Sequence, residues 1–229
     1  MGSISSELRA VLFGLVGKEA SPSVRLWWES TLNIAPLLST DGELRRMYTR
    51  TARMLGAAPI DLSHDEWEAI SRDECPLLLC GRPLHELGRM VLLLQAAEVL
   101  APELCGELIR DLYERGDLAE RQALLRALPL LQDPGSFLST AVEACRSNVQ
   151  TVFEAIACEN PYPARYFPDL NCNQMIMRAI VAGLPLQRVV GLASRITPEL
   201  VRMARDHMQE CIAAHRAVHK GIQLIIGVG

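Results

Sequence analysis

The sequence predicts an all-α fold, and three observations support this prediction. Apolar residues recur with a period near 3.6 over most of the chain. Residues that favour helix ends recur between these stretches. No stretch bounded by turns alternates as a strand does, and the tail Ile222–Val228 is the one ambiguous segment. With 229 residues, 49% of them hydrophobic, we expect a single all-helical domain over residues 1–229.

The composition argues against several classes of protein. The formal net charge is −4, and no run of Lys and Arg is present, so nucleic-acid binding through phosphates is not expected. The apolar stretch Ala10–Val16 is too short to span a bilayer, and we expect neither a transmembrane helix nor a secretory signal. The seven Cys follow no regular framework, which favours reduced thiols and a cytoplasmic location.

Helix starts and stops can be placed in order through residues 1–100. Ser21 precedes Pro22 as a cap, Asp41 begins a segment that Gly56 can end, and residues 63–66 have the spacing of a capping box. The stripe that begins at Leu84 is wide enough to predict a helix buried on several sides. Three tryptophans, which are Trp27, Trp28 and Trp67, are interpreted as core anchors.

From residue 101 to about 220 the predicted helices are short and closely spaced. The candidates are Pro102–Arg115, Asp117–Leu128 (with a capping box from Asp117 to Glu120), Pro134–Arg146 after Asp133, and Asn148–Cys158. Their lengths are typical of stacked helical hairpins in an irregular HEAT-like solenoid, although no clean repeat is visible, and an orthogonal helix bundle is the alternative.

The last predicted helix begins with Thr197 as a cap before Pro198. Cys211, His215 and His219 are spaced so that one face could present all three to a metal, but core packing with exposed His is the simpler interpretation, and we expect no metal. The apolar tail, residues 221–229, could dock on this chain, contact a partner or touch a membrane.

The segment from Cys158 to Asn173 interrupts the helical pattern. It carries Pro161, Pro163 and Pro168, which exclude a continuous helix, and it also contains two of the four Tyr. Such a loop either packs its aromatic rings on the core or lines a functional site on a rigid scaffold.

Here the sequence resembles the EboA family. The resemblance covers roughly Leu124–Ala204, and the N-terminal half matches only loosely. It rests on the runs Arg126–Leu131, Glu143–Asn148, Val152–Ala164, Phe167–Pro168, Asn173–Met175, Gly183–Leu186, Val190–Leu192, Pro198–Leu200 and Met203–Ala204.

The resemblance implies an accessory role in synthesis or export of a small metabolite, with a prenylated cyclitol-like compound as the candidate. The family is named after gene clusters that also encode a membrane prenyltransferase, so this and other pathway enzymes are implied partners. No cofactor and no established catalytic residue come with the resemblance. A non-catalytic scaffold or adaptor for pathway enzymes is the alternative function.

The polar residues of the interrupting segment are the candidate site. Glu159, Tyr162 and Tyr166 are candidate catalytic residues; Asn160, Arg165, Asn173 and Gln174 are candidate ligand-binding residues. The alternative is that these amides satisfy loop backbone, Asn160 forms an Asx-turn and the Tyr rings pack. Arg146 and Arg165 could bind a phosphate or carboxylate, or form structural ion pairs. A nucleophilic Cys158 or Cys172 would need His85 or His207 beside it.

Overall fold

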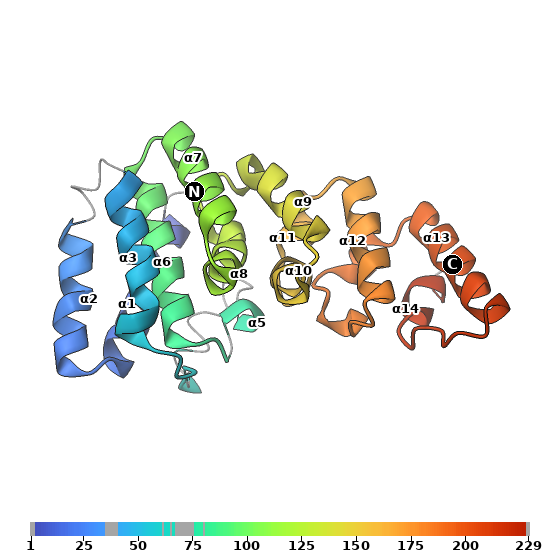
Figure 1. Cartoon of the computed structure of the whole chain (residues 1–229), viewed down its shortest axis with the longest axis horizontal. Helices are drawn as coiled ribbons and strands as arrows, with labels where there is room; N and C mark the ends of the chain where they lie inside the picture. Colours follow the sequence, from blue (N-terminus) through green and yellow to red (C-terminus); the bar gives the residue numbers. More distant parts are fainter. Residues whose placement is uncertain are drawn as a thin grey trace. The chain divides into compact units, whose positions relative to one another are not determined.

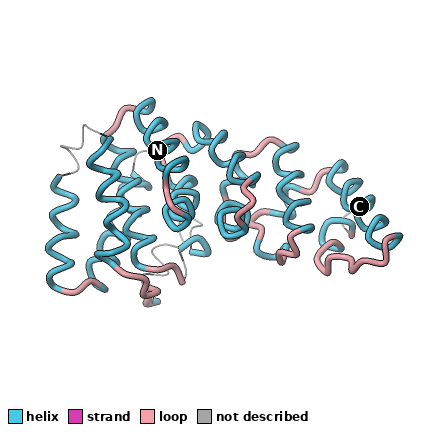
Figure 2. Tube along the Cα trace, viewed as in Figure 1, coloured by secondary structure: helices cyan, strands magenta, loops and turns pink. Residues whose placement is uncertain are grey.

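The computed structural model describes residues 3–34, 41–60, 62–64, 66, 76–79 and 81–227. Throughout these ranges the regular secondary structure is helical, and no strand is formed (Figure 2). The all-α prediction is therefore confirmed. The chain falls into two compact units, Met1–Thr140 and Ala141–Gly229, so each unit is described by itself. The division lies about forty residues beyond the subdivision expected near residue 100.

The first unit is a group of helices packed around one central helix (Figure 1). The elements that the structure describes in it are α1 (Ser3–Glu19), α2 (Pro22–Ile34), α3 (Asp41–Leu55), α5 (Pro76–Leu79), α6 (Leu84–Val99), α7 (Pro102–Arg115), α8 (Leu118–Ala127), η2 (Leu128–Leu130) and η3 (Pro134–Phe137). Helix α6 packs against α1, α3 and α8 and is buried almost throughout its length. The prediction of a helix covered on several sides is confirmed.

The centre of the first unit also buries charge. On α6, Glu86 accepts a hydrogen bond from Arg126 of α8 over 2.8 Å, and Arg89 lies 3.5 Å from Glu120 of α8. Arg89 also donates to the backbone oxygen of Tyr48 (3.1 Å), whose hydroxyl donates to the backbone oxygen of Glu120 (2.8 Å). Burial raises the pKa of the Tyr48 phenol well above its ordinary value. Two Arg and two Glu are thus buried together with balanced charge.

The second unit is a series of α-helices and 3-10 turns. Helix α9 (Leu138–Arg146) leads into it, and its further elements are α10 (Gln150–Ala157), α11 (Tyr162–Tyr166), α12 (Asp169–Val181), η4 (Leu186–Arg188), η5 (Leu192–Arg195), α13 (Pro198–Ala213) and α14 (Gln223–Ile226). The helices predicted before and after the Pro-rich segment agree with α7 to α10 and α13 within two residues at most ends. The exception is the helix predicted to begin at Pro134, which begins as the 3-10 turn η3.

Most predicted caps are formed. The backbone N–H of Ser63 donates to Glu66, whose own N–H donates to the Ser63 hydroxyl. Asp117 and Glu120 form the reciprocal pair at the start of α8, and Thr197 accepts from Leu200 N–H. Asp133 does not form the cap predicted for it. Its backbone is left-handed, with φ 45°, and its side chain caps nothing, so that prediction is wrong.

Two other expectations need correction. The interrupting segment is not free of helix, because α11 and the start of α12 lie in it. Pro163 falls in the first turn of α11 and Pro168 immediately precedes α12, where a missing N–H removes no helical hydrogen bond. Within the tail that the sequence left ambiguous, Gln223–Ile226 forms the helix α14, which packs against α13, and Ile222 and Ile225 are buried. Self-docking is thus the alternative that the structure shows for the tail.

Candidate functional site

Glu159 lies at the bend between α10 and α11 and is bound to Arg188. Its carboxylate accepts two hydrogen bonds from the Arg188 guanidinium, over 2.6 and 3.0 Å, and its N–H donates to the Arg188 backbone oxygen over 2.8 Å. Arg188 also donates to Glu154 over 2.8 Å. These hydrogen bonds, that to Glu159 first, raise the pKa of Arg188 above its ordinary value. The structure therefore places Glu159 in a two-pronged ion pair.

Asn160 connects the end of α10 to the start of α11. It is 1% exposed. Its amide nitrogen donates to the backbone oxygen of Ala155 over 2.9 Å, and its amide oxygen accepts from the N–H of Tyr162 over 2.9 Å. The second hydrogen bond forms the Asx-turn that was given as the alternative role of Asn160 in the sequence analysis.

The two candidate tyrosines form a ring cluster with Phe167. The Tyr162 ring lies 4.9 Å from the Tyr166 ring and 6.1 Å from the Phe167 ring, measured between centroids. Tyr162 is fully buried and Tyr166 is partly exposed. Arg165, between them, is exposed. The three rings pack on one another within α11 and the residue that follows it.

Residues that follow α12 in the sequence pack against the bend between α10 and α11 and against α11 itself. Gly191, with φ 71°, faces Ala164 of α11 so closely that a Cβ on Gly191 would lie 2.7 Å from the Ala164 Cβ. Arg195 donates to the backbone oxygen of Phe167 over 2.6 Å and lies 3.0 Å from the carboxylate of Asp169. Together with Arg188, these contacts hold α11 at both ends.

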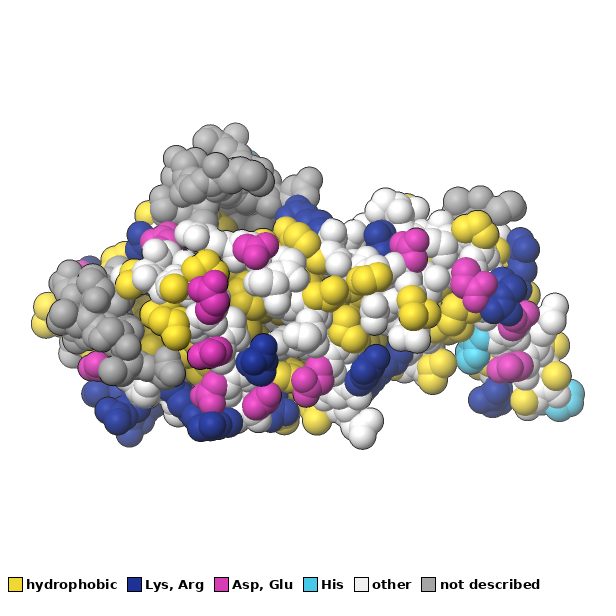
Figure 3. Space-filling view, turned by 90° about the horizontal axis from the view of Figure 1, so that it is seen from above, with side chains coloured by type: hydrophobic (Ala, Val, Ile, Leu, Met, Phe, Trp, Pro, Cys, Tyr) yellow, Lys and Arg dark blue, Asp and Glu magenta, His cyan; other side chains and the backbone are white. Residues whose placement is uncertain are grey.

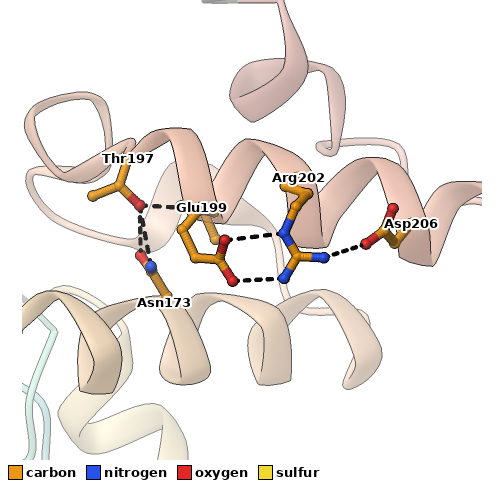
Figure 4. Close-up of polar contacts among 6 residues, drawn as sticks. Asn173, Thr197, Glu199, Arg202 and Asp206 are labelled. Atoms are coloured by element: carbon orange, nitrogen blue, oxygen red, sulfur yellow. Dashed lines mark hydrogen bonds and ion pairs between the residues drawn. The ribbon is translucent and has the colours of Figure 1, made fainter.

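Asn173 joins α12 to the start of α13 (Figure 4). Its amide nitrogen donates to the Thr197 hydroxyl oxygen over 3.1 Å, and that oxygen also accepts from the N–H of Leu200 over 3.1 Å. Asn173 is 3% exposed. The same view shows the exposed face of α13, where Arg202 pairs with Glu199 and Asp206. Asn173 of α12 thus binds the residue that caps α13, and it links the two helices.

A pocket of about 320 Å³ lies beside this framework, between α9 and α12. It is lined by Val142, Cys145 and Arg146 of α9, by Phe167, and by Asn171, Gln174, Met175 and Arg178 of α12. We call it the α9–α12 pocket. The spacing of its lining residues by three and four positions places them on one face of each helix. Its walls combine apolar groups with two amides and two guanidinium groups.

Of the seven candidate site residues, this pocket includes Gln174, and it also includes Arg146, which was considered from the sequence either as an anion binder or as part of a structural ion pair. Asn171 and Arg178 were missed. The signal that could have found them is the spacing of Asn171, Gln174 and Arg178 at i, i+3 and i+7 on one helix face.

The two arginines that line the pocket differ in the partners that they bind. Arg178 donates to the backbone oxygens of Cys145 and Ser147 at the end of α9, and its guanidinium lies 4.3 Å from the Phe153 ring centroid. Arg146 is exposed and forms no ion pair with any carboxylate in the described part of the chain. Burial raises the pKa of the Cys145 thiol to about 12, so this thiol stays protonated at neutral pH.

The histidines and the cysteine that were considered for metal binding or nucleophilic catalysis contact nearby groups of the protein. His219 contacts the backbone oxygen of Leu184 (3.0 Å) and accepts from Gly221 N–H (3.0 Å). Cys211 lies 3.6 Å from His207, and His85 from α6 lies 2.8 Å from the Gly56 oxygen. Among the described residues no group of three His, Cys, Asp or Glu is placed to hold a metal ion. Trp67, one of the three predicted core anchors, lies outside the described residues.

No helix in the described ranges has both the length and the apolar character needed to cross a bilayer.

The fold and the pocket define an all-helical protein whose second unit carries a pocket of small-molecule size between two helices. The chain belongs to the EboA family, because the family model described as metabolite traffic protein EboA matches residues 10–227. The relationship thus extends beyond Leu124–Ala204 to nearly the whole chain, and it supports a general metabolite-related accessory role. No curated protein and no solved structure matches the chain.

Proposed function

We propose that this protein binds a small organic metabolite in the α9–α12 pocket and acts as a non-catalytic carrier or accessory protein. The observation that carries the proposal is the lining of the pocket. Phe167, Met175 and Val142 offer apolar contact, while Gln174 and the exposed Arg146 offer hydrogen-bond donors. Pockets that bind small ligands typically combine a largely apolar wall with a few polar groups that fix orientation.

The surroundings of the candidate reactive groups favour binding over catalysis. A general base must have a free lone pair directed at its substrate, and the Glu159 carboxylate is bound by two guanidinium nitrogens of Arg188. Tyr162 is fully buried among rings. Cys145, which does line the pocket, stays a thiol, and a thiol is a poor nucleophile.

The pocket is adjacent to the segment expected to carry the site, and the clamped bend supports one of its walls through Phe167. We therefore assign Glu159, Asn160, Asn173 and the two tyrosines a positioning role, with Gln174 contacting the metabolite. Within this proposal, the prenylated cyclitol-like pathway and the membrane prenyltransferase as a partner rest on the family resemblance alone.

The test is to fill the pocket and look for loss of a co-purified compound. Val142→Trp places a large ring in the pocket, whereas Val181→Trp makes the same change on α12 at a side chain that is 70% exposed. We expect native mass spectrometry of protein from the producing cells to show a bound small molecule in the wild type and in Val181→Trp. Val142→Trp should have lost it while retaining its circular dichroism spectrum.

Two results would contradict the proposal. One is a wild-type protein that carries no small molecule after gentle purification and shows no saturable uptake from a metabolite extract. The other is a Val142→Trp protein that retains the same adduct as the wild type, which would place the binding site elsewhere.

A further inference from the structure

Helix α3 is seated on α6 in one fixed orientation. Its residues Leu44, Tyr48 and Thr51 are buried. Gly88 of α6 approaches so closely that a Cβ there would lie 2.3 Å from Leu55 and 3.0 Å from Thr51 side-chain atoms. Because rotation of α3 about its axis would break this close fit, the opposite face of the helix is held toward solvent.

That outer face carries a row of arginines, Arg46, Arg50 and Arg53, which we call the α3 arginine row. All three are exposed. Their spacing of four and three positions aligns them on one face over about 10 Å of helix axis. Together with Arg45 and Thr49 they line a shallow hollow of about 650 Å³. In the space-filling view (Figure 3), dark blue Lys and Arg side chains lie along the lower edge at the left, with magenta Asp and Glu side chains among them.

The charges of the row are not neutralised within the described structure. Arg45, next to the row, pairs with Asp111 over 3.1 Å. Arg50 lies 5.9 Å from the Trp27 ring centroid, which orients the guanidinium but leaves its charge in place. Across the described ranges no carboxylate forms an ion pair with Arg46, Arg50 or Arg53. Like charges at such spacing repel one another, in a chain whose net charge is −4.

We propose that the α3 arginine row is a binding site for phosphate groups, separate from the α9–α12 pocket. A guanidinium group presents parallel N–H donors that match two oxygens of a phosphate. Three such groups in line suit adjacent phosphates, either of one diphosphate compound or of neighbouring phospholipid headgroups. A single carboxylate could engage only part of the row. The Thr49 hydroxyl, between the arginines, adds a neutral hydrogen-bond donor.

The experiment uses the full chain and two probes. Inorganic pyrophosphate is titrated by calorimetry, and vesicles of phosphatidylcholine with about 30% phosphatidylglycerol are tested by co-sedimentation against phosphatidylcholine alone. We expect the wild type to bind at least one anionic probe at low ionic strength and to lose binding at about 0.5 M salt. The Arg46→Gln/Arg50→Gln/Arg53→Gln variant should bind at least about tenfold more weakly.

A matched control removes three exposed arginines elsewhere, as Arg110→Gln/Arg205→Gln/Arg216→Gln. It should bind within about twofold of the wild type, because it changes net charge equally but leaves the row intact. The double variant Arg46→Gln/Arg53→Gln, which keeps the Arg50–Trp27 contact, should also be weakened and guards against misfolding of the triple variant.

The two probes separate the two sources of phosphate. Binding of pyrophosphate alone indicates a free phosphorylated compound, and binding of vesicles alone indicates lipid headgroups. The proposal is overturned if the wild type binds neither probe, or if the row and control variants are weakened equally.

Discussion

Gly191 occupies a position that a residue with a side chain can take only with strain. Its φ of 71° lies in the left-handed region, and a Cβ would lie 2.7 Å from the Ala164 Cβ. Gly183 has nearly the same φ, 72°, but its Cβ would meet nothing within 4 Å. Comparing Gly183 with Gly191 therefore separates two contributions to the loss of stability in a Gly to Ala substitution. One is backbone strain, and the other is steric collision of the new Cβ.

We predict that Gly183→Ala lowers the free energy of unfolding by about 1 kcal/mol, since only the backbone is strained. Gly191→Ala should cost about 2–4 kcal/mol, because α11 must also move away. Urea denaturation of the two variants measures the difference. Adding Ala164→Gly to Gly191→Ala should recover the collision part alone. Equal costs for the two single variants would show that α11 is not clamped by Gly191.

At the scale of the element, the start of α13 depends on a residue of another helix. Thr197 accepts hydrogen bonds from Leu200 N–H and from the buried Asn173 of α12. A helix cap of this type contributes about 1 kcal/mol. Here its removal also leaves the Asn173 amide buried without this partner, which costs about 1–3 kcal/mol more.

We therefore expect Thr197→Ala to destabilise the protein by about 2–4 kcal/mol. Thr197→Ser keeps the hydroxyl oxygen and should stay within about 0.5 kcal/mol of the wild type. Hydrogen exchange at Leu200 N–H should accelerate in the Ala variant only. If Ala and Ser behave alike, the hydroxyl does not join the two helices.

At the scale of the whole molecule, the chain consists of two units, each with its own buried residues. The first unit depends on the buried pair Glu86–Arg126, whose side chains are 8% and 7% exposed. Removing one partner of such a pair leaves a charge in a medium that solvates it poorly, and the cost typically reaches about 3–5 kcal/mol.

Arg126→Met should therefore destabilise the first unit by about 3–5 kcal/mol, and Glu86→Leu combined with Arg126→Met should recover most of that loss. Hydrogen exchange followed by mass spectrometry should show faster exchange in α6 and α8 and unchanged exchange in α10 and α12. Equal acceleration in both units would mean that the chain opens as one cooperative structure.

How much of the structure could be predicted depends on how far apart the interacting residues lie in the sequence. The cap residues Asp117 and Thr197 could be recognised because a cap bonds a backbone N–H only three positions away. The same local rules misjudged the proline-rich segment. A proline in the first turn is compatible with a helix, and Pro163 occupies such a position in α11.

The contacts of the candidate site residues could be predicted only where the partner is close in the sequence. The alternative for Asn160, an Asx-turn, depends on its nearest neighbours and could be stated from the sequence. The partner of Glu159 could not, because Arg188 lies 29 positions away and nothing in a helical period links the two. For the same reason the pairing of Glu86 with Arg126 was not anticipated.

By itself the sequence determined the helical class, most helix ends and the segment where helices are interrupted, because periodicity and capping act within about one or two turns. Only the tertiary structure decided which charges are neutralised and which face outward. It bound Glu159 to Arg188, buried Arg89 and Arg126, and left Arg146 and the α3 arginine row exposed. The physical reason is that the state of a charge depends on the groups folded around it, and in this chain those groups come from distant helices.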